Sequence, residues 1–325
     1  NSNRDVISPP ASFAYLIALR ALRKPILVIT ASSKAAEDLA KEIHELHTDT
    51  LEFPAWETLP HERLSPSSDT VAKRISTLHS LKEQKKNWVV VAPIRAVIHK
   101  FNAQIINTKP IILERGLEFD LSELQQKLVT FSYNRTDLVE RRGEFAVRGG
   151  ILDIFPPDQN HPIRIDFFGD EIEDLSFFTV SDQRTNQSIA TSISILPCRE
   201  LLIDQEIKQK AKELSSEFES ELLSKIANGL MPEGMESLIP LLINDLKLIS
   251  DSMPVGFEPI YIERERVIGR ISDLLATNEE FREAAWSNAA VGGKAPIESG
   301  STYIDWDALR SELPNARDFR QFGSD

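Results

Sequence analysis

Three side chains between residues 148 and 168 are of types that bind other proteins, namely Arg148, Arg164 and Phe168. A guanidinium can hold a carboxylate through two parallel hydrogen bonds, and a benzyl side chain can fill a desolvated pocket. Arg and Phe are accordingly enriched at the centres of protein interfaces. Burying a Phe against a partner contributes roughly 1.5 to 3 kcal/mol before ordering costs. The chemistry that these residue types offer is recognition.

The stretch "IRIDFF" (163–168) places Arg164 and Phe168 on one side of a predicted strand. Successive side chains of a strand alternate between faces, so the two isoleucines and Phe167 form an apolar face and Asp166 lies beside Arg164 on the other. Phe168 is therefore a large aromatic residue on a charged, outward face.

Two explanations for Phe168 stay open at this point. In the first, a partner protein covers the ring, and Arg148 and Arg164 belong to the same interface. In the second, a neighbouring domain of the same chain covers Phe168, and the arginines pair with Asp166 and Asp170.

Short strands must position these side chains, because alternating segments separated by turn residues run from about residue 131 to residue 200. Gly169-Asp170 reads as a hairpin turn between two of the strands. The pair Gly149-Gly150 is predicted to contain a one-residue bulge, with Arg148 and Asp153 facing outward. The expected domain is β-rich, spans 131–200, and carries the recognition residues.

The segments on either side of this domain show a different pattern, in which apolar runs alternate with amphipathic helices. Strands are predicted at 25–30, 50–53, 88–92 and 258–263, and helices at 9–22, 32–46, 69–82, 204–226, 235–250 and 265–286. Buried β-branched runs alternating with helices favour a parallel α/β sheet. The expected organisation is an α/β domain that begins in 1–130 and resumes within 201–325, with a helical segment and a partly linker-like tail after Gly292. A loop over 53–68 is long enough to be functional or disordered.

Composition and charge restrict the function. The chain has 325 residues, a formal charge of −13 and 41% hydrophobic residues. Residues 1–100 carry 14 Lys and Arg against 11 Asp and Glu, whereas residues 201–325 carry 13 against 23. Such an acidic final third argues against strong nucleic-acid binding by the chain itself, since phosphate neutralisation supplies most non-specific affinity.

With one cysteine, no long apolar stretch and no signal peptide, we expect a cytoplasmic protein without membrane contact. The absence of an initial Met leads us to expect a fragment of a larger protein.

Catalytic and cofactor chemistry is missing from the sequence. The first glycine is Gly116, so residues 1–115 contain no glycine-rich phosphate loop, and Pro9 and Pro10 lack amide donors where such a loop would begin a helix. The "HELH" stretch (44–47) does not have zinc-protease spacing, and Cys198 has no adjacent partner that would make it a nucleophile. We therefore predict no catalytic residue, no cofactor and no metal, and no enzyme activity for this chain.

Long stretches of the sequence resemble a known family. The segments "FPAWETLPHERLSPSSDTVAKRISTL" (53–78), "VVVAPIRAVI" (89–98) and "ERRGEFAVRGGILDIFPP" with "PIRIDFFGDEIEDLSFFTVSDQRT" (140–185) closely resemble bacterial transcription-repair coupling factors, the Mfd family. The resembling region of that family is itself similar to the excision-repair protein UvrB. It implies a degenerate, helicase-like (RecA-type) α/β domain that lacks a phosphate loop, interrupted by a β-rich domain that docks on UvrA.

The resemblance also implies roles for particular residues. The family's UvrA contact uses two arginines and a phenylalanine, which fall on Arg148 in "AVRGG", Arg164 in "PIRID" and Phe168 in "DFFGD". UvrB itself would have a Gly-Lys-Thr phosphate loop and a tyrosine-rich hairpin that grips DNA. The corresponding loop here is "PAWETLPHERLSP", without those tyrosines.

The sequence thus leads to the hypothesis of a UvrA-recruiting, UvrB-mimicking docking module that acts in transcription-coupled nucleotide excision repair. The larger protein would be an ATP-dependent DNA translocase that also binds RNA polymerase and duplex DNA. Two alternatives from other classes are a DNA-binding accessory module, which would use the slightly basic first hundred residues, and a degenerate ATPase or helicase domain of the UvrB type.

Overall fold

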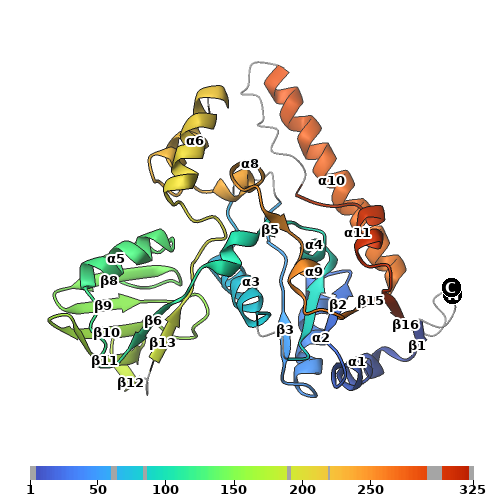
Figure 1. Cartoon of the computed structure of the whole chain (residues 1–325), viewed down its shortest axis with the longest axis horizontal. Helices are drawn as coiled ribbons and strands as arrows, with labels where there is room; N and C mark the ends of the chain where they lie inside the picture. Colours follow the sequence, from blue (N-terminus) through green and yellow to red (C-terminus); the bar gives the residue numbers. More distant parts are fainter. Residues whose placement is uncertain are drawn as a thin grey trace. The chain divides into compact units, whose positions relative to one another are not determined.

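The chain forms two compact units in the computed structural model, which describes residues 5–59, 64–82, 86–188, 192–218, 220–290 and 302–321. The parallel-sheet unit comprises Asn1–Ser65, Thr77–Ala103 and Glu236–Asp325. The β-rich unit comprises Pro66–Ser76 and Gln104–Met235. Figure 1 shows both units, each with its own sheet.

Six parallel strands build the sheet of the first unit. In spatial order they are β1 (Val6–Ile7), β16 (Arg317–Arg320), β15 (Glu258–Ile262), β2 (Ile26–Thr30), β4 (Val89–Pro93) and β3 (Thr50–Glu52). Every residue of β2 and β4 is buried, as expected for β-branched runs in a sheet that is covered on both faces. The parallel sheet and the predicted strands β2, β3, β4 and β15 are confirmed.

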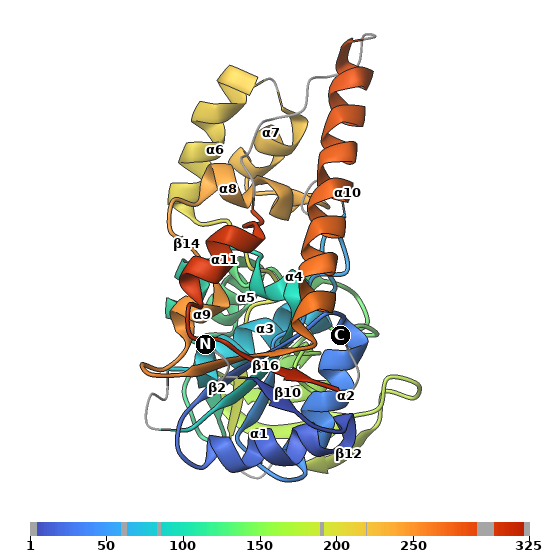
Figure 2. The ribbon, with the colours of Figure 1, turned by 90° about the vertical axis from the view of Figure 1, so that its right-hand side faces the viewer.

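Helices cover this sheet. Ile26 and Val28 of β2 pack with α1 (Phe13–Ala21) and α2 (Ser33–His44), and the Ser32 hydroxyl caps α2 by accepting a hydrogen bond from the Ala35 amide at 3.2 Å. The alternate residues Leu27 and Ile29 are fully buried too. Outside the α1–α2 cluster, α4 (Ile94–Val97) and α10 (Arg264–Ala290) contact β2 and β15, and α10 continues well past the strands in Figure 2.

Pro9 caps the short helix η1 (Pro10–Ser12), which begins at Pro10 and leads into α1. In the long loop after β3, Phe53 and Trp56 are buried, and the Trp56 ring lies edge-on to His99 at 4.5 Å. Positions 60–63 of that loop lie outside the described residues. No helix among the described residues has the length and hydropathy of a membrane span.

The sheet contains two strands that the sequence did not predict. β1 and β16 come from opposite ends of the chain and pair with each other, and β16 inserts between β1 and β15. β16 follows α11 (Trp306–Glu312), so ordered elements occupy part of the tail after Gly292. The sequence "RDFR" has only one apolar residue, Phe319, and its strand is specified by distant partners and not by its own pattern.

The β-rich unit is built on a second six-stranded sheet. Its spatial order is β12 (Thr185–Ser188), β11 (Glu171–Phe178), β10 (Ile163–Phe168), β9 (Ile151–Ile154), β8 (Glu144–Arg148) and β7 (Asn134–Arg135), antiparallel except for the parallel pair β7 and β8. One face packs against α5 (Leu121–Thr130), whose Leu124 and Leu128 join the core (Figure 1). β6 (Ile111–Glu114) and β13 (Ser192–Ile195) form a two-stranded antiparallel sheet beside it.

The hairpins differ from the sequence expectation in one respect. The predicted bulge at Gly149-Gly150 is wrong, because β8 and β9 pair without interruption from Phe145 with Ile154 to Arg148 with Ile151. Residues that pair directly across two strands already share a face, so no bulge is needed to leave Arg148 and Asp153 outward.

The irregularity lies instead in the next hairpin, where the register of β10 with β11 shifts between Asp166 and Phe167. The shift leaves one residue of β11 extra and places both Ile172 and Leu175 in the core, although they are three positions apart.

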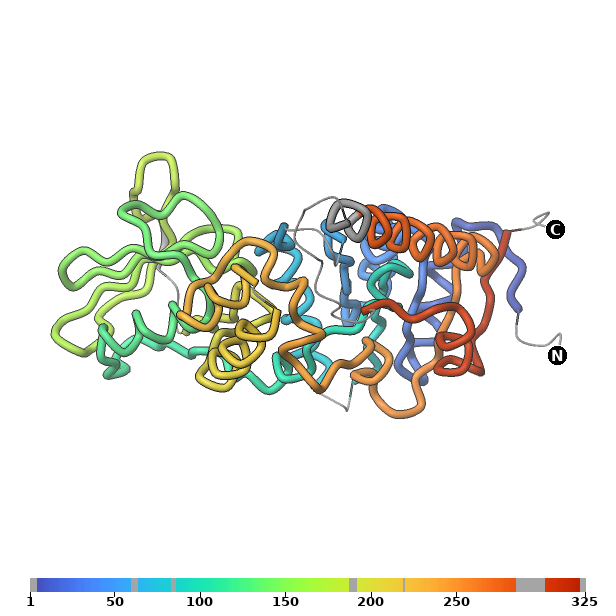
Figure 3. The backbone as a smooth tube through the Cα atoms, turned by 90° about the horizontal axis from the view of Figure 1, so that it is seen from above, coloured from blue at the N-terminus to red at the C-terminus, as the bar shows by residue number. Residues whose placement is uncertain are grey.

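Helices and two short strands make up the remaining elements. In the β-rich unit, the helix predicted over 204–226 is present as two helices, α6 (Gln205–Phe218) and α7 (Glu221–Ala227), and the Ser220 side chain caps the second. The helix predicted over 235–250 is broken into η3 (Met235–Leu238), α8 (Ile239–Leu242) and α9 (Ile249–Ser252) by strand β14 (Leu246–Lys247), which pairs with β5 (Phe101–Asn102). The remaining elements are η2 (Ala103–Asn107) and α3 (Ser68–Ser80). Figure 3 follows the backbone through all of these elements.

Candidate functional site

The side of the β-rich sheet that points away from its main core carries the predicted recognition residues. We call this surface the Phe168 face and define it by Arg148, Ile151, Asp153, Arg164, Asp166 and Phe168. Cross-strand pairing fixes its layout. Arg148 pairs with Ile151, which pairs in turn with Asp166, while Asp153 pairs with Arg164 in the neighbouring row. Phe168 lies at the end of β10 and pairs with Glu171.

Phe168 projects into solvent, and 79% of the residue is exposed. The two-residue turn Gly169-Asp170 follows it directly, and Gly169 has a φ of 63°, a conformation that favours glycine. The predicted hairpin turn is confirmed. The preceding Phe167 packs on the main core, so the alternation expected from "IRIDFF" holds to the end of the strand.

All three guanidinium nitrogens of Arg164 donate hydrogen bonds within the chain. Its Nε and Nη2 donate to the two carboxylate oxygens of Asp153 at 2.7 and 2.9 Å, and its Nη1 donates to the main-chain oxygen of Gln183 at 3.2 Å. The guanidinium also lies 4.9 Å from the centre of the Phe178 ring. The hydrogen bond with Asp153 raises the pKa of Arg164, which therefore stays charged at any physiological pH.

Arg148 approaches the same carboxylate from the other side. Its Nη2 donates to Asp153 at 3.3 Å, but half of its side chain (51%) is exposed, compared with 19% for Arg164. Both predicted arginines thus lie on one face and converge on one acid.

Asp153, which the sequence predicted only to face outward, is the acid that both arginines contact. Its side chain is 2% exposed. The alternative in which the arginines pair with Asp166 and Asp170 is wrong as to the partner, since both pair with Asp153. An uninterrupted hairpin through Gly149-Gly150 followed by an antiparallel β10 places Asp153 directly opposite Arg164, and the predicted bulge hid this pairing.

The part of this face farthest from Phe168 is buried under a small cluster of apolar residues, whereas the part near the β10–β11 turn is exposed to solvent. Val139, Ala146, Phe155 and Phe178 form a small second core there. Toward the hairpin, burial raises the pKa of Asp166, and Asp174 raises it further while Arg164 opposes the shift. The face is therefore basic at Arg148 and acidic around Asp166, with Ile151 between them.

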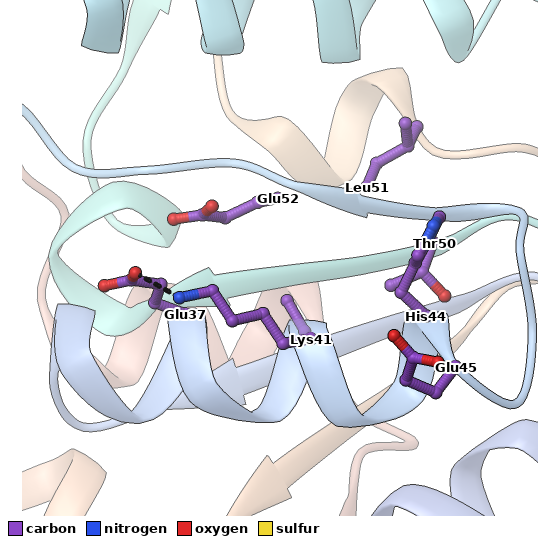
Figure 4. Close-up of a pocket in the computed structure, with 8 residues that line it drawn as sticks. Glu37, Lys41, His44, Glu45, Thr50, Leu51 and Glu52 are labelled. Atoms are coloured by element: carbon purple, nitrogen blue, oxygen red, sulfur yellow. Dashed lines mark hydrogen bonds and ion pairs between the residues drawn. The ribbon is translucent and has the colours of Figure 1, made fainter.

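In the described parts of the chain, the other candidate chemistry does not assemble into a site. His44 is exposed and lines a shallow pocket of about 230 Å³ between α2 and β3, next to the Glu37–Lys41 ion pair of 2.7 Å (Figure 4). Among the described residues no group of three His, Cys, Asp or Glu side chains is arranged to hold a metal ion. Cys198 is buried, and burial raises the pKa of its thiol.

Comparison with known proteins shows which family the chain belongs to. Residues 111–201 match the UvrB interaction domain family, and this range contains all of the Phe168 face. The chain is 37% identical to the transcription-repair-coupling factor of Mycobacterium tuberculosis over 329 aligned residues, which cover 93% of the chain and 27% of that protein. It is 28% identical to the Escherichia coli transcription-repair-coupling factor, with 90% of the chain and 26% of that protein covered. It is also 27% identical to the UvrABC system protein B of Microcystis aeruginosa over 68% of the chain.

A parallel α/β sheet unit joined to a β-rich UvrB interaction domain defines a UvrB-like module. The match over nine-tenths of its length makes the chain a UvrB-homology module of the transcription-repair-coupling factor family. The chain spans about a quarter of the length of these curated relatives.

Proposed function

We propose that the Phe168 face is a docking surface for UvrA, and that the chain recruits UvrA during transcription-coupled nucleotide excision repair by presenting a surface like that of UvrB. The observation that carries the proposal is the exposure of Phe168, 79% of which faces solvent within the region that matches the UvrB interaction domain. A large aromatic side chain at the rim of an antiparallel sheet, on the same face as a half-exposed arginine, has the composition of an interface hot spot.

The energetics of the surface agree with a docking role. Because 79% of Phe168 is exposed, most of its apolar area is available to a partner. Transfer of a Phe side chain from water is worth roughly 1.5 to 3 kcal/mol. Arg148 and Asp166 provide charges of opposite sign on either side of Ile151, which fixes the orientation of a complementary partner.

A titration of the chain with UvrA tests the proposal. Phe168→Ala is expected to weaken binding at least about tenfold, because removal of a central aromatic anchor commonly costs 2 kcal/mol or more. Tyr15→Ala is the matched control, since Tyr15 is an aromatic residue that is 56% exposed on α1, in the other unit. Equal affinity of the wild type and the Phe168 variant would contradict the proposal.

The chain is proposed to act by binding and not by catalysis. In a longer protein of this family, we propose that other domains carry ATP-driven translocation on duplex DNA and contact RNA polymerase. Calorimetry of this chain with ATP and magnesium is expected to show no binding heat, and binding of nucleotide would favour the degenerate ATPase alternative.

A further inference from the structure

The two arginines of the Phe168 face are not equivalent. Arg164 has three of its guanidinium nitrogens engaged, two by Asp153 and one by the Gln183 carbonyl, and its plane lies against Phe178. Gln183 is itself fixed, because its side-chain amide donates to the Val180 carbonyl at 2.9 Å. A partner carboxylate that sought the paired donors of Arg164 would have to displace Asp153, which is buried and would be left without its main counter-ion.

Arg148 has the opposite character. Its one hydrogen bond to Asp153 is long, at 3.3 Å, and uses only Nη2. Since 51% of the side chain is exposed, the remaining N–H donors are open to a ligand, while the contact with Asp153 still restricts where the guanidinium lies. An exposed arginine that is partly fixed in advance loses less side-chain entropy on binding than a mobile one.

We infer that Arg148 is the guanidinium that binds a carboxylate of the partner, and that Asp153, held by Arg164, is a positioning residue that fixes Arg148 for this contact. This inference rests on the proposed function and assigns different roles to residues that the sequence treats alike. Arg164 acts through Asp153 and does not grip the partner, whereas Arg148 and Phe168 touch it.

The layout of the face also determines the chemistry of the partner. Ile151 is 37% exposed and pairs across the strands with both Arg148 and Asp166. A partner carboxylate must therefore lie on the Arg148 side of Ile151, because Asp166 repels it on the other. The matching surface of UvrA is an apolar pocket for Phe168 with a carboxylate at one rim.

A double-mutant cycle on UvrA binding separates positioning from a merely structural role. Asp153→Asn keeps the shape of the side chain and removes its charge. In the wild-type background this change is expected to weaken binding about 5- to 20-fold, whereas in the Arg148→Ala background it should change affinity less than about twofold, as expected for residues that act through one contact. A loss of equal size in both backgrounds would show that Asp153 only stabilises the sheet, and would overturn the inference.

A second measurement needs no substitution and no partner. Side-chain NMR relaxation of the arginine Nε–H groups is expected to rank Arg164 as the most rigid, Arg148 as intermediate and the exposed Arg135 of β7 as mobile. Arg148 as mobile as Arg135 would overturn the inference, even if Asp153→Asn failed to fold. Failure of the proposed function is a different result, in which the wild-type chain does not bind UvrA although the NMR ranking holds.

Discussion

At the scale of single residues, exposure and partnership around Asp153 decide what each substitution costs. Phe168 is exposed and contacts little, while Arg164 neutralises a carboxylate that is 2% exposed. Residues that look alike in an alternating strand therefore differ in whether they serve the fold or the surface.

Arg164→Ala is expected to destabilise the β-rich unit by about 2 to 4 kcal/mol, because it leaves Asp153 buried with only the long contact from Arg148. Phe168→Ala is expected to change stability by no more than about 0.5 kcal/mol. Hydrogen exchange of amides in β9 and β10 measures both effects within the β-rich unit. Similar losses of protection for the two variants would contradict the assignment of Arg164 to the fold.

The pKa of Asp166 predicts a pH dependence. Burial raises this pKa above its ordinary value of 3.8, so ionisation of Asp166 costs more in the folded state than in the unfolded state. Asp166→Asn removes that cost and is expected to raise the melting temperature at pH 7. The gain should shrink as the pH falls toward about 4, where the wild-type carboxyl becomes protonated in both states. A gain in melting temperature that grows at low pH would show that folding lowers the pKa of Asp166 instead of raising it.

The sequence could predict part of this site. The alternation in "IRIDFF" suffices to place Arg164 and Phe168 outward, and the turn at Gly169-Asp170 is a local signal. The shared acid could not be found from residue types alone, because its identification requires the register of three strands.

At the scale of elements, the two glycines between β8 and β9 have different duties. Gly149 has a φ of 62° and open space around it, whereas a Cβ on Gly150 would lie 2.8 Å from the main-chain oxygen of Phe167. The close approach is real, since the Phe167 amide donates to the Gly150 carbonyl at 2.8 Å. The glycine pair therefore lets β10 extend past the end of β9 and carry Phe168 to the rim.

Gly150→Ala is expected to cost about 2 to 3 kcal/mol, because backbone must move to relieve the clash. Gly149→Ala should cost only about 1 kcal/mol, the penalty of a left-handed conformation for alanine. Urea unfolding followed by far-UV circular dichroism compares the two variants. The opposite order of costs would show that the turn, and not the approach of β10, requires glycine here.

The bulge was misplaced for a related reason. Glycines attract the prediction of an irregularity, yet the register shift lies in β11, where the sequence "EIEDLSFF" contains no glycine. What the shift achieves is burial of both Ile172 and Leu175, and only the packed core reveals that requirement.

At the scale of the whole molecule, the tryptophans and the Phe168 face fall in different units. All four tryptophans, Trp56, Trp88, Trp286 and Trp306, belong to the parallel-sheet unit, and the Phe168 face belongs to the other. Tryptophan fluorescence therefore reports on one unit only.

Phe319→Ala tests this separation. Phe319 is fully buried in β16 and its ring lies 5.8 Å from that of Phe13, edge to face. Its truncation should cost about 3 to 5 kcal/mol and shift the transition seen by tryptophan fluorescence. Affinity for UvrA should remain within about twofold of the wild type if the proposed docking surface is confined to the β-rich unit. A large loss of affinity would show that the two units depend on each other.

Architecture was the most predictable feature at this scale, because β2, β4 and β15 are apolar runs whose burial is evident from composition. The pairing of β1 with β16 at the edge of this sheet was not predictable, because β1 has only two residues and β16 has only one apolar residue.

The pairing of β2 with β15 and of β1 with β16 has a consequence for biosynthesis. On the ribosome, β2, β3 and β4 emerge early but cannot complete their sheet until residues 258–320 have been made, which takes on the order of ten seconds after residue 235 at typical elongation rates. Every segment of the β-rich unit precedes those residues in the sequence, since the unit ends at Met235. We therefore expect the Phe168 face to be able to form during synthesis before β2, β3 and β4 pair with β15 and β16.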